Sequence, residues 1–280
     1  MGDLRTRWRR LQLGLATLLT DRPRGFFIPY RHADQVTAAL DYAAAARAFR
    51  QAQAQFTATL DAVESVAADL ERIAAAAEPP EPRWNQDWLV TLDAAVLYAL
   101  LRSRRPKRVV EVGSGHSTRF IARAIRDGAL TTQVTAIDPQ PRADISRLKV
   151  TQLRSVVQAA DPAVFAALES GDILFIDSSH ILMPGTDVDL LLNGVLPQLP
   201  AGVLVHVHDI FLPEDYPPGW RWRGYNEQLG VMALIAGGGW QPLFASNYAR
   251  LHLAAQLGRS VVARLPGIEA PASSLWLQKR

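Results

Sequence analysis

VVEVGSGHST, residues 109–118, is the most informative segment of this 280-residue chain. A short run of β-branched residues leads into a turn that carries Gly113 and Gly115, and a helix is predicted to follow through Ile125. Glycines allow the backbone to approach a ligand closely, and the first turn of a helix has N–H groups without partners inside the helix. The segment therefore predicts a strand, a ligand-binding turn and a helix.

Two acidic residues near this turn indicate which class of ligand it binds. The dinucleotide fingerprint needs a third glycine, and Thr118 stands at that position. Glu111 would repel a pyrophosphate but attract positive charge, and Asp138, after the next predicted strand, is placed to accept hydrogen bonds from both ribose hydroxyls. S-adenosylmethionine, a nucleoside with a cationic arm and no phosphate, fits both acids. The alternative is structural: Glu111 caps a helix, and Asp138 starts the turn before Pro139.

Strands and helices are predicted to alternate through the rest of this region. Further strands are predicted at residues 132–137, 151–157, 172–176, 203–207, 241–248 and 273–278, and helices at 87–102, 188–196 and 226–235. The strands at 172–176 and 203–207 are apolar without alternation, as in strands covered on both faces. The order predicts an α/β, doubly wound, mostly parallel sheet.

The N-terminal part of the chain differs in composition. Residues 33–77 contain no Gly or Pro, and their apolar residues recur at helical spacing, which predicts one long helix or a helical hairpin. Such a thin apolar stripe must pack on the main domain or on a second copy, so a homodimer through this helix is one expectation. The prolines at 79, 80 and 82 end the helix, and we place a boundary between a helical extension, 1–83, and a main domain, 84–280.

The first residues carry a separate signal. Arginines at positions 5, 7, 9 and 10 precede the apolar residues 11–19, a pattern that resembles a weak signal peptide. Gln12 and Gly14 interrupt the apolar run and no small-residue cleavage site follows it, which favours a short amphipathic helix. Contact of this helix with a membrane surface is the alternative.

The composition excludes several classes of protein. Cysteine is absent, which excludes disulfide frameworks, iron–sulfur clusters and cysteine nucleophiles and fits a cytoplasmic location. A net charge of +3 is too small to indicate a nucleic-acid partner. No apolar run approaches the ~20 residues that span a bilayer.

Four segments together resemble the class I S-adenosylmethionine-dependent methyltransferases, most closely a bacterial O-methyltransferase-like subgroup. They are EVGSG at 111–115, Asp138, DILFIDSSH at 172–180 and PAGVLVHVHD at 200–209. The resemblance covers the chain from about Trp84 onward and implies a seven-stranded Rossmann-like sheet whose last strand is antiparallel. It also implies a cofactor site in which motif I holds the methionine part, Asp138 holds the ribose and residues 158–161 flank the adenine. The expected cofactor-binding residues are Glu111, Gly113, Ser114, Gly115, Ser117, Asp138 and Asp161.

A second cluster follows two neighbouring predicted strands. Asp177, His180, His208 and Asp209 should meet there, because ligands of parallel sheets bind at the carboxyl ends of strands. We expect these four to be catalytic: either histidine is a candidate base, and a divalent metal is an alternative activator. Metal-dependent relatives have an Asn where Ile210 stands, which argues against their magnesium site, and histidine ligands would favour a softer metal. The metal ligands stay unassigned, and we interpret His206 as structural, with its side chain opposite to that of His208.

The loop at residues 213–226 is dense in aromatic residues and arginines. It is predicted either to bind an acidic or planar substrate as a lid or to cover an apolar edge of the domain.

Taken together, the sequence predicts an S-adenosylmethionine-dependent methyltransferase that O-methylates a small-molecule acceptor. The alternatives are a metal-dependent hydroxylase-like enzyme on the same fold, and a nucleotide-binding or scaffold protein without catalysis.

Overall fold

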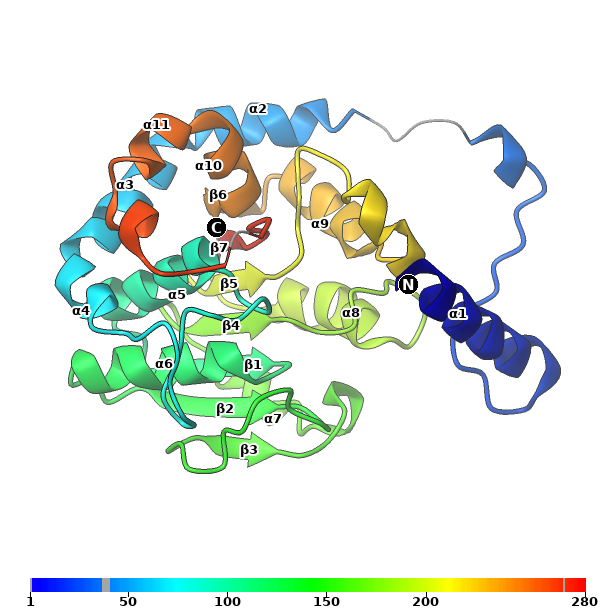
Figure 1. The fold of residues 1–280 in the computed structure, drawn as a ribbon, viewed down its shortest axis with the longest axis horizontal. Coiled ribbons are helices and arrows are strands. Elements are labelled where there is room, and N and C mark those ends of the chain that lie inside the picture. The colour runs from blue at the N-terminus through cyan, green and yellow to red at the C-terminus, as the bar shows by residue number, and fades with distance from the viewer. Residues whose placement is uncertain (1, 37–40, 269) are drawn as a thin grey trace. The chain divides into compact units, whose positions relative to one another are not determined.

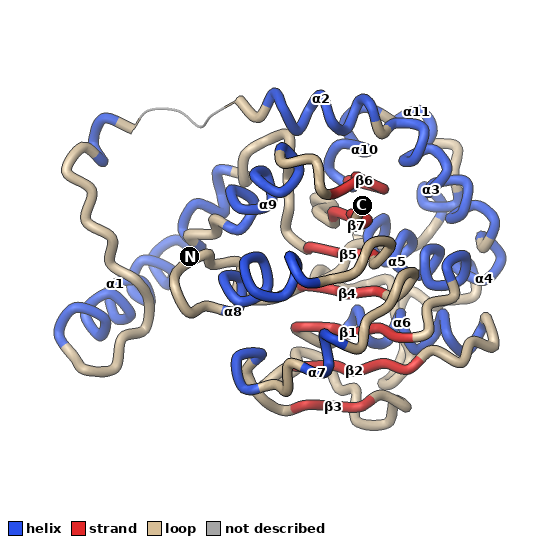
Figure 2. The backbone as a smooth tube through the Cα atoms, turned by 180° about the vertical axis from the view of Figure 1, so that it is seen from behind, coloured by secondary structure: helices blue, strands red, loops and turns tan. Residues whose placement is uncertain are grey.

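A computed structural model describes residues 2–36, 41–268 and 270–280. It contains two compact units, Met1–Leu40 and Asp41–Arg280, each of which is described by itself. The larger unit contains all the strands of the sheet (Figures 1 and 2).

The sheet has seven strands in the order β3-β2-β1-β4-β5-β7-β6. The five strands from β1 to β5 pair in parallel, whereas β7 is antiparallel to both of its neighbours, β5 and β6. The strands are β1 (Arg108–Val112), β2 (Gln133–Ile137), β3 (Thr151–Leu153), β4 (Ile173–Ile176), β5 (Leu204–Val207), β6 (Trp240–Ala245) and β7 (Leu275–Lys279). The predicted fold class, with its last strand antiparallel, is confirmed.

Helices cover both faces of this sheet, which explains why every residue of β4 and β5 is buried. Helices α5 (Thr91–Arg104) and α6 (His116–Asp127) lie in front of the strands in Figure 1, and α8 (Asp187–Asp189) lies in front of them in Figure 2. A π-helical segment, Leu190–Val195, continues α8. After β1, this unit also contains α7 (Ala163–Ala166), α9 (Glu227–Ala236), α10 (Ser246–His252) and α11 (Ala254–Leu257), with 3-10 turns at Val157–Ala159, Leu196–Gln198, Pro218–Arg223 and Val261–Arg264.

The helical region before the prolines differs from its prediction. Instead of one long helix or a hairpin, three short helices follow one another: α2 (Ala43–Gln51), α3 (Gln53–Ser65) and α4 (Ala67–Glu71). They bend around the edge of the domain (Figure 1), and breaks at Ala52 and Val66 let the apolar stripe follow that surface.

These helices share the core of the larger unit. The Phe56 ring lies 5.6 Å from the rings of both Phe244 and Tyr248, and the hydroxyl of Thr59 donates a hydrogen bond to the carbonyl oxygen of Leu243 at 3.1 Å. The apolar stripe is thus covered by the chain's own sheet. The compact unit begins at Asp41, so the division at residue 83 stays a prediction about where the methyltransferase-like part begins.

The smaller unit contains α1 (Gly2–Leu19) and a short 3-10 turn, Ala33–Gln35. The predicted helix over residues 11–19 is confirmed, and it extends to Gly2. After α1 the chain reverses, and the backbone N–H of Arg24 donates to the hydroxyl of Thr17 at 3.0 Å. Within the described residues, no helix combines the length and the apolar character needed to cross a membrane.

Candidate functional site

The glycine turn and the second polar cluster meet at the carboxyl ends of β1 and β4. These strands pair in register, with Val112 opposite Ile176, so the residues that follow them lie side by side. Gly113 has a φ of +80°, and a Cβ at this position would overlap the carbonyl oxygen of Asp177. Only glycine satisfies both restrictions, and its close approach brings the two predicted clusters together.

Hydrogen bonds from both sides fix the shape of the glycine turn. The backbone N–H of Ser114 donates to Oδ2 of Asp138 at 2.7 Å, while Oδ1 of Asp138 accepts from the N–H of Gln140 at 2.7 Å. The N–H of Gly115 donates to the hydroxyl of Thr118 at 2.9 Å. Asp138 thus joins the turn after β1 to the turn after β2, which is the structural role given as the alternative; its contact with a ribose stays a prediction.

Glu111 is a buried carboxyl group with one oxygen free. Its Oε2 accepts a hydrogen bond from the hydroxyl of Thr118 at 2.6 Å, but its Oε1 is buried without a partner. Burial raises the pKa of Glu111 to about 8, although hydrogen bonds from Ser117 and Thr118 oppose the shift. A cation next to Oε1 would satisfy this atom and stabilise the ionised form, so the site fits a ligand that carries an ammonium group.

The predicted cofactor-binding residues do not all gather at this turn. Glu111, Ser114 and Asp138 are linked to it as described, with Ser117 in the first turn of α6. Asp161 is exposed, and its Oδ1 accepts from the backbone N–H of Ala163 at the start of α7. Among the described residues, no hydrogen bond joins Asp161 to the glycine turn, so its contact with an adenine stays a prediction.

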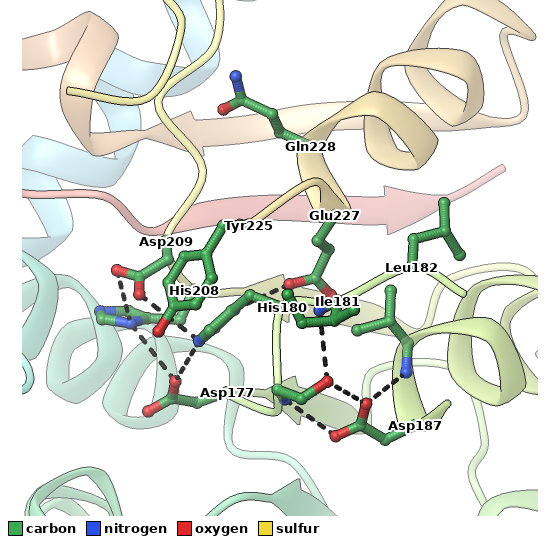
Figure 3. Close-up of polar contacts among 12 residues, drawn as sticks. Asp177, His180, Ile181, Leu182, Asp187, His208, Asp209, Tyr225, Glu227 and Gln228 are labelled. Carbon is green, nitrogen blue, oxygen red and sulfur yellow. Dashed lines mark hydrogen bonds and ion pairs between the residues drawn. The ribbon is translucent and has the colours of Figure 1, made fainter. Parts of the chain in front are cut away.

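The four residues predicted to be catalytic lie together (Figure 3). Nε2 of His180 is 3.4 Å from Oδ1 of Asp177 and 3.5 Å from Oδ2 of Asp209. Nδ1 of His208 is 3.6 Å from Oδ1 of Asp177 and 3.4 Å from Oδ1 of Asp209. Each imidazole therefore lies against the same two carboxylates.

Glu227, in the first turn of α9, belongs to this cluster although it was not predicted. Its Oε2 is 2.9 Å from Nδ1 of His180, and its side chain is fully buried (Figure 3). The backbone N–H of Glu227 also donates to the carbonyl oxygen of His180 at 3.3 Å. Because Nδ1 of His180 is bonded to Glu227, its Nε2 faces Asp177 and Asp209.

Asp93 is the second residue that was not predicted. It lies on α5, and its Oδ2 is 3.7 Å from Nε2 of His208. Its carboxylate also accepts from the backbone N–H groups of Ser273 and Ser274, at 3.0 and 3.2 Å. A single acid within the buried stretch 92–101 of this helix is the signal that points to it.

Two members of the cluster have backbone conformations that side chains rarely adopt. His180 has a φ of +62° and Asp209 a φ of +56°. Left-handed conformations cost roughly 1–2 kcal/mol for residues with a Cβ. They occur where the surrounding structure enforces them, often at functional sites, so their presence at two adjacent strand ends supports a functional interpretation.

The close carboxylates determine the ionisation of the cluster. Burial alone would lower the pKa of His180, but its hydrogen bonds with Asp177 and Glu227 raise it well above the ordinary histidine value. Burial likewise opposes charge on His208, but Asp177 and Asp209 raise the pKa of its ring well above that value. Burial would raise the pKa of Asp177, yet the two rings hold it well below its usual range. The carboxylates therefore favour the protonated form of both imidazoles.

A cavity of about 140 Å³ lies next to this cluster. Trp88 and Arg142 line one part of it, with the guanidinium 4.2 Å from the ring centroid. The loop at 213–226 contributes Trp220, Arg223 and Tyr225, and the Tyr225 ring lies 4.6 Å from that of His180 (Figure 3). The aromatic loop therefore borders the site.

In the part of the chain that the structure describes, no group of three or more His, Cys, Asp or Glu residues is placed to hold a metal ion. The imidazoles are instead paired with carboxylates, and Ile210, where metal-dependent relatives have Asn, is buried.

His206 is buried beneath the site. Its ring stacks on Phe175 at 3.7 Å, and its Nε2 is 2.8 Å from the hydroxyl of Ser274. The prediction that it points away from His208 is wrong: their ring centroids are 5.8 Å apart, because residues two apart in a strand share a face.

The fold and the glycine turn together have the organisation of a class I methyltransferase. Residues 110–210 match the family described as a methyltransferase domain, which confirms the class inferred from the motifs. This match extends from β1 through Asp209, so it includes both the glycine turn and the four clustered residues. No curated protein sequence matches the chain.

Several solved structures are similar at low identity. Methyltransferase PaMTH1 of Podospora anserina, bound to S-adenosylhomocysteine, is 15% identical with a TM-score of 0.41, covering 91% of this chain and 99% of that one. An O-methyltransferase of Bacillus cereus, also in complex with S-adenosylhomocysteine, is 14% identical with a TM-score of 0.43, covering 80% and 91%. A putative O-methyltransferase of Klebsiella pneumoniae is 14% identical with a TM-score of 0.35, covering 79% and 89%.

Proposed function

We propose that this methyltransferase transfers the methyl group of S-adenosylmethionine to a hydroxyl oxygen of a small molecule. One observation carries the proposal: Gly113, in the turn expected to hold the donor, lies against the carbonyl oxygen of Asp177, whose side chain contacts both imidazoles. A donor at this turn and an acceptor beside His180 would share one cleft, as methyl transfer requires.

The turn has suitable groups for the donor. Oε1 of Glu111 would accept a hydrogen bond from the ammonium group of the methionine part, and Asp138 would accept hydrogen bonds from the ribose hydroxyls. Because Gly113 has no side chain, the carbonyl oxygen of Asp177 lies directly against the turn. When bound, S-adenosylmethionine supplies an electrophilic methyl group on its sulfonium.

His180 is the proposed base. Its Nδ1–H donates to Glu227, which fixes the ring and leaves Nε2 beside Asp177 and Asp209 at the cavity. In its neutral form, Nε2 takes the proton of the acceptor hydroxyl as the oxygen attacks. His208, whose ring lies against Asp177 and Asp209, would stabilise the developing oxyanion through its positive charge.

The cavity wall indicates the class of acceptor. Trp88, Trp220 and Tyr225 present aromatic rings, while Arg142 and Arg223 bring positive charge to the same wall. Flat rings beside guanidinium groups suit a planar molecule with an acidic substituent. We therefore propose a phenolic or enolic hydroxyl on such a molecule as the methyl acceptor.

The test begins with binding and proceeds to turnover. Calorimetry should show that S-adenosylmethionine binds the protein, and a panel of hydroxylated aromatic acids should then yield S-adenosylhomocysteine in equal amount to methylated product. His180→Asn should reduce turnover ~100-fold or more with little change in cofactor affinity, because a base typically contributes 10²–10⁴-fold. His252→Asn, at an exposed histidine of α10, is the matched control.

The outcomes separate the alternatives. Cofactor binding without turnover on any acceptor would favour a non-catalytic protein, and oxidised product without S-adenosylhomocysteine would favour the hydroxylase-like enzyme. Neither alternative has an observation of its own in support. A homodimer and a cytoplasmic location stay predictions.

A further inference from the structure

The positive charge of this chain is concentrated in its first unit. Residues 1–40 contain seven arginines and three aspartates, with no lysine or glutamate, and so carry a net charge of +4. Because the whole chain carries +3, residues 41–280 carry −1. The basic character of the sequence is therefore a local property of the unit that contains α1.

Helix α1 also presents an uncovered apolar face. Leu4, Trp8, Leu11, Leu15 and Leu18 follow one another at intervals of four and three residues, and their side chains are 48–79% exposed. At 3.6 residues per turn these positions fall within an arc of about 80°. An isolated helix of this length is marginal in water, so the face needs a partner.

A second apolar segment follows the helix. Phe26, Phe27, Ile28 and Tyr30 are each 55–65% exposed, and they lie between Arg24 and Arg31. The hydrogen bond from Arg24 to Thr17 brings the start of this segment back beside the last turns of α1. The unit thus exposes one helical and one extended apolar segment, each bordered by arginines.

We propose that this unit binds the surface of an anionic lipid membrane, with α1 lying in the plane of the interface. The apolar side chains would enter the boundary between headgroups and acyl chains, while the arginines contact anionic headgroups. A planar lipid surface covers a helical and an extended segment together, and its negative charge complements the local charge of +4. The inference is independent of the reaction catalysed by the larger unit.

A second copy of this chain is the competing partner, because the spacing of four and three is also that of a coiled-coil seam. Self-pairing of α1 would bring together two helices that each contain Arg5, Arg7, Arg9 and Arg10, with Asp3 as their only acid. It would also leave Phe26 and Phe27 exposed, since they lie outside the helix. Both features favour the membrane surface.

The experiment is flotation of the full chain with lipid vesicles. Vesicles of phosphatidylcholine alone should recover little protein, whereas vesicles that also contain phosphatidylglycerol should recover most of it, and added salt should reduce the recovery. Leu11→Glu should lower the partition into anionic vesicles by roughly tenfold or more, because it places a charge on the apolar face. Leu13→Glu is the matched control: it makes the same chemical change on the opposite face of α1 and should retain most of the binding.

Several results would overturn the proposal. They are absence of binding to anionic vesicles, equal binding to neutral ones, and equal loss in the two variants. Light scattering of the same samples gives a further test. If the parent protein is a dimer that does not bind vesicles, and Leu11→Glu converts it to a monomer, the apolar face binds a second copy of the chain. Thermal unfolding of both variants should match that of the parent protein, which shows that the larger unit is intact.

Discussion

Glu111 places a carboxyl group with a pKa of about 8 inside the domain, far above its ordinary value of 4.5. The folded state therefore favours the protonated form. The stability that results is fully present below pH ~4.5 and is lost as the pH rises through about 8. We expect the free energy of unfolding to fall by on the order of a few kcal/mol across this window, apart from the contributions of other groups.

Glu111→Gln should remove much of this decline, because the amide keeps the shape of the side chain and cannot ionise. Urea unfolding at pH 5 and pH 8 measures the difference. Glu169→Gln, at an exposed carboxylate paired with Lys107, should follow the parent protein at both values. Parallel pH dependence of the Glu111→Gln variant and the parent protein would show that Glu111 does not ionise in this range.

Glu227 is proposed as a positioning residue for His180. Because the carboxylates raise the pKa of His180, turnover should increase with pH into the alkaline range as the ring becomes neutral. Glu227→Gln removes one of these carboxylates, so the rise should occur at lower pH while the maximal rate falls. A pH profile of kcat with and without the substitution tests this. If kcat is lower at every pH but rises at the same pH as in the parent protein, Glu227 has a structural role only.

At this scale the sequence reveals residues that follow strands more readily than residues on helices. Asp177 and Asp209 could be predicted together because parallel strands end at a common edge. Glu227 and Asp93 could not, because the packing of α9 and α5 against the sheet determines which of their turns faces His180 and His208. The contact expected for Asp161 rested on a third strand whose end could not be located in the sequence.

Among the elements, the turn between β1 and α6 tolerates little change. Gly113→Ala combines a positive φ with overlap between the new methyl group and the carbonyl of Asp177, so it should reduce the free energy of unfolding by roughly 3 kcal/mol or more. Gly238→Ala is a suitable control, because Gly238 has a φ of +76° but open space around it. It should cost only about 1–2 kcal/mol. Denaturant unfolding of both variants compares them directly, and equal losses would contradict the close approach.

The elements themselves were predictable where the hydrophobic pattern is strong and ambiguous where it is not. The segment at 241–248 was predicted as one strand, but β6 ends at Ala245 and α10 begins at Ser246. Residues 33–77 have helical periodicity throughout, and no Gly or Pro in the sequence marks the breaks at Ala52 and Val66. The three helices bend around the edge of the domain, and no local pattern in the sequence encodes the surface that they follow.

On the scale of the whole molecule, α2, α3 and α4 belong to the core. Six large apolar side chains within these helices or just after them are at most 2% exposed. They are Phe49, Phe56, Leu60, Val63, Leu70 and Ile73. Burial of each such side chain contributes roughly 1.5–3 kcal/mol to the free energy of unfolding, whereas the net free energy of unfolding of a domain is only ~5–15 kcal/mol.

Two truncations test this arrangement. Removal of residues 1–40 should leave the melting temperature nearly unchanged, because those residues form a separate compact unit. Removal of residues 1–78 should abolish cooperative unfolding, since it uncovers Phe244 and Tyr248. Calorimetric scans distinguish the two, and a cooperative transition in the shorter protein would mean that the sheet is stable without these helices.

The position of β7 has a consequence for how the protein is made. It is the last strand in the sequence, yet it lies between β5 and β6 in the sheet. A ribosome releases the chain from its N-terminus, so β6 waits without a hydrogen-bonding neighbour until the residues up to Lys279 have emerged. Helices α2 and α3, synthesised about two hundred residues earlier, pack against that waiting strand. The complete sheet therefore cannot form before β7 has been synthesised, and the nascent chain must keep its early apolar surfaces from other partners until that strand pairs with β5 and β6.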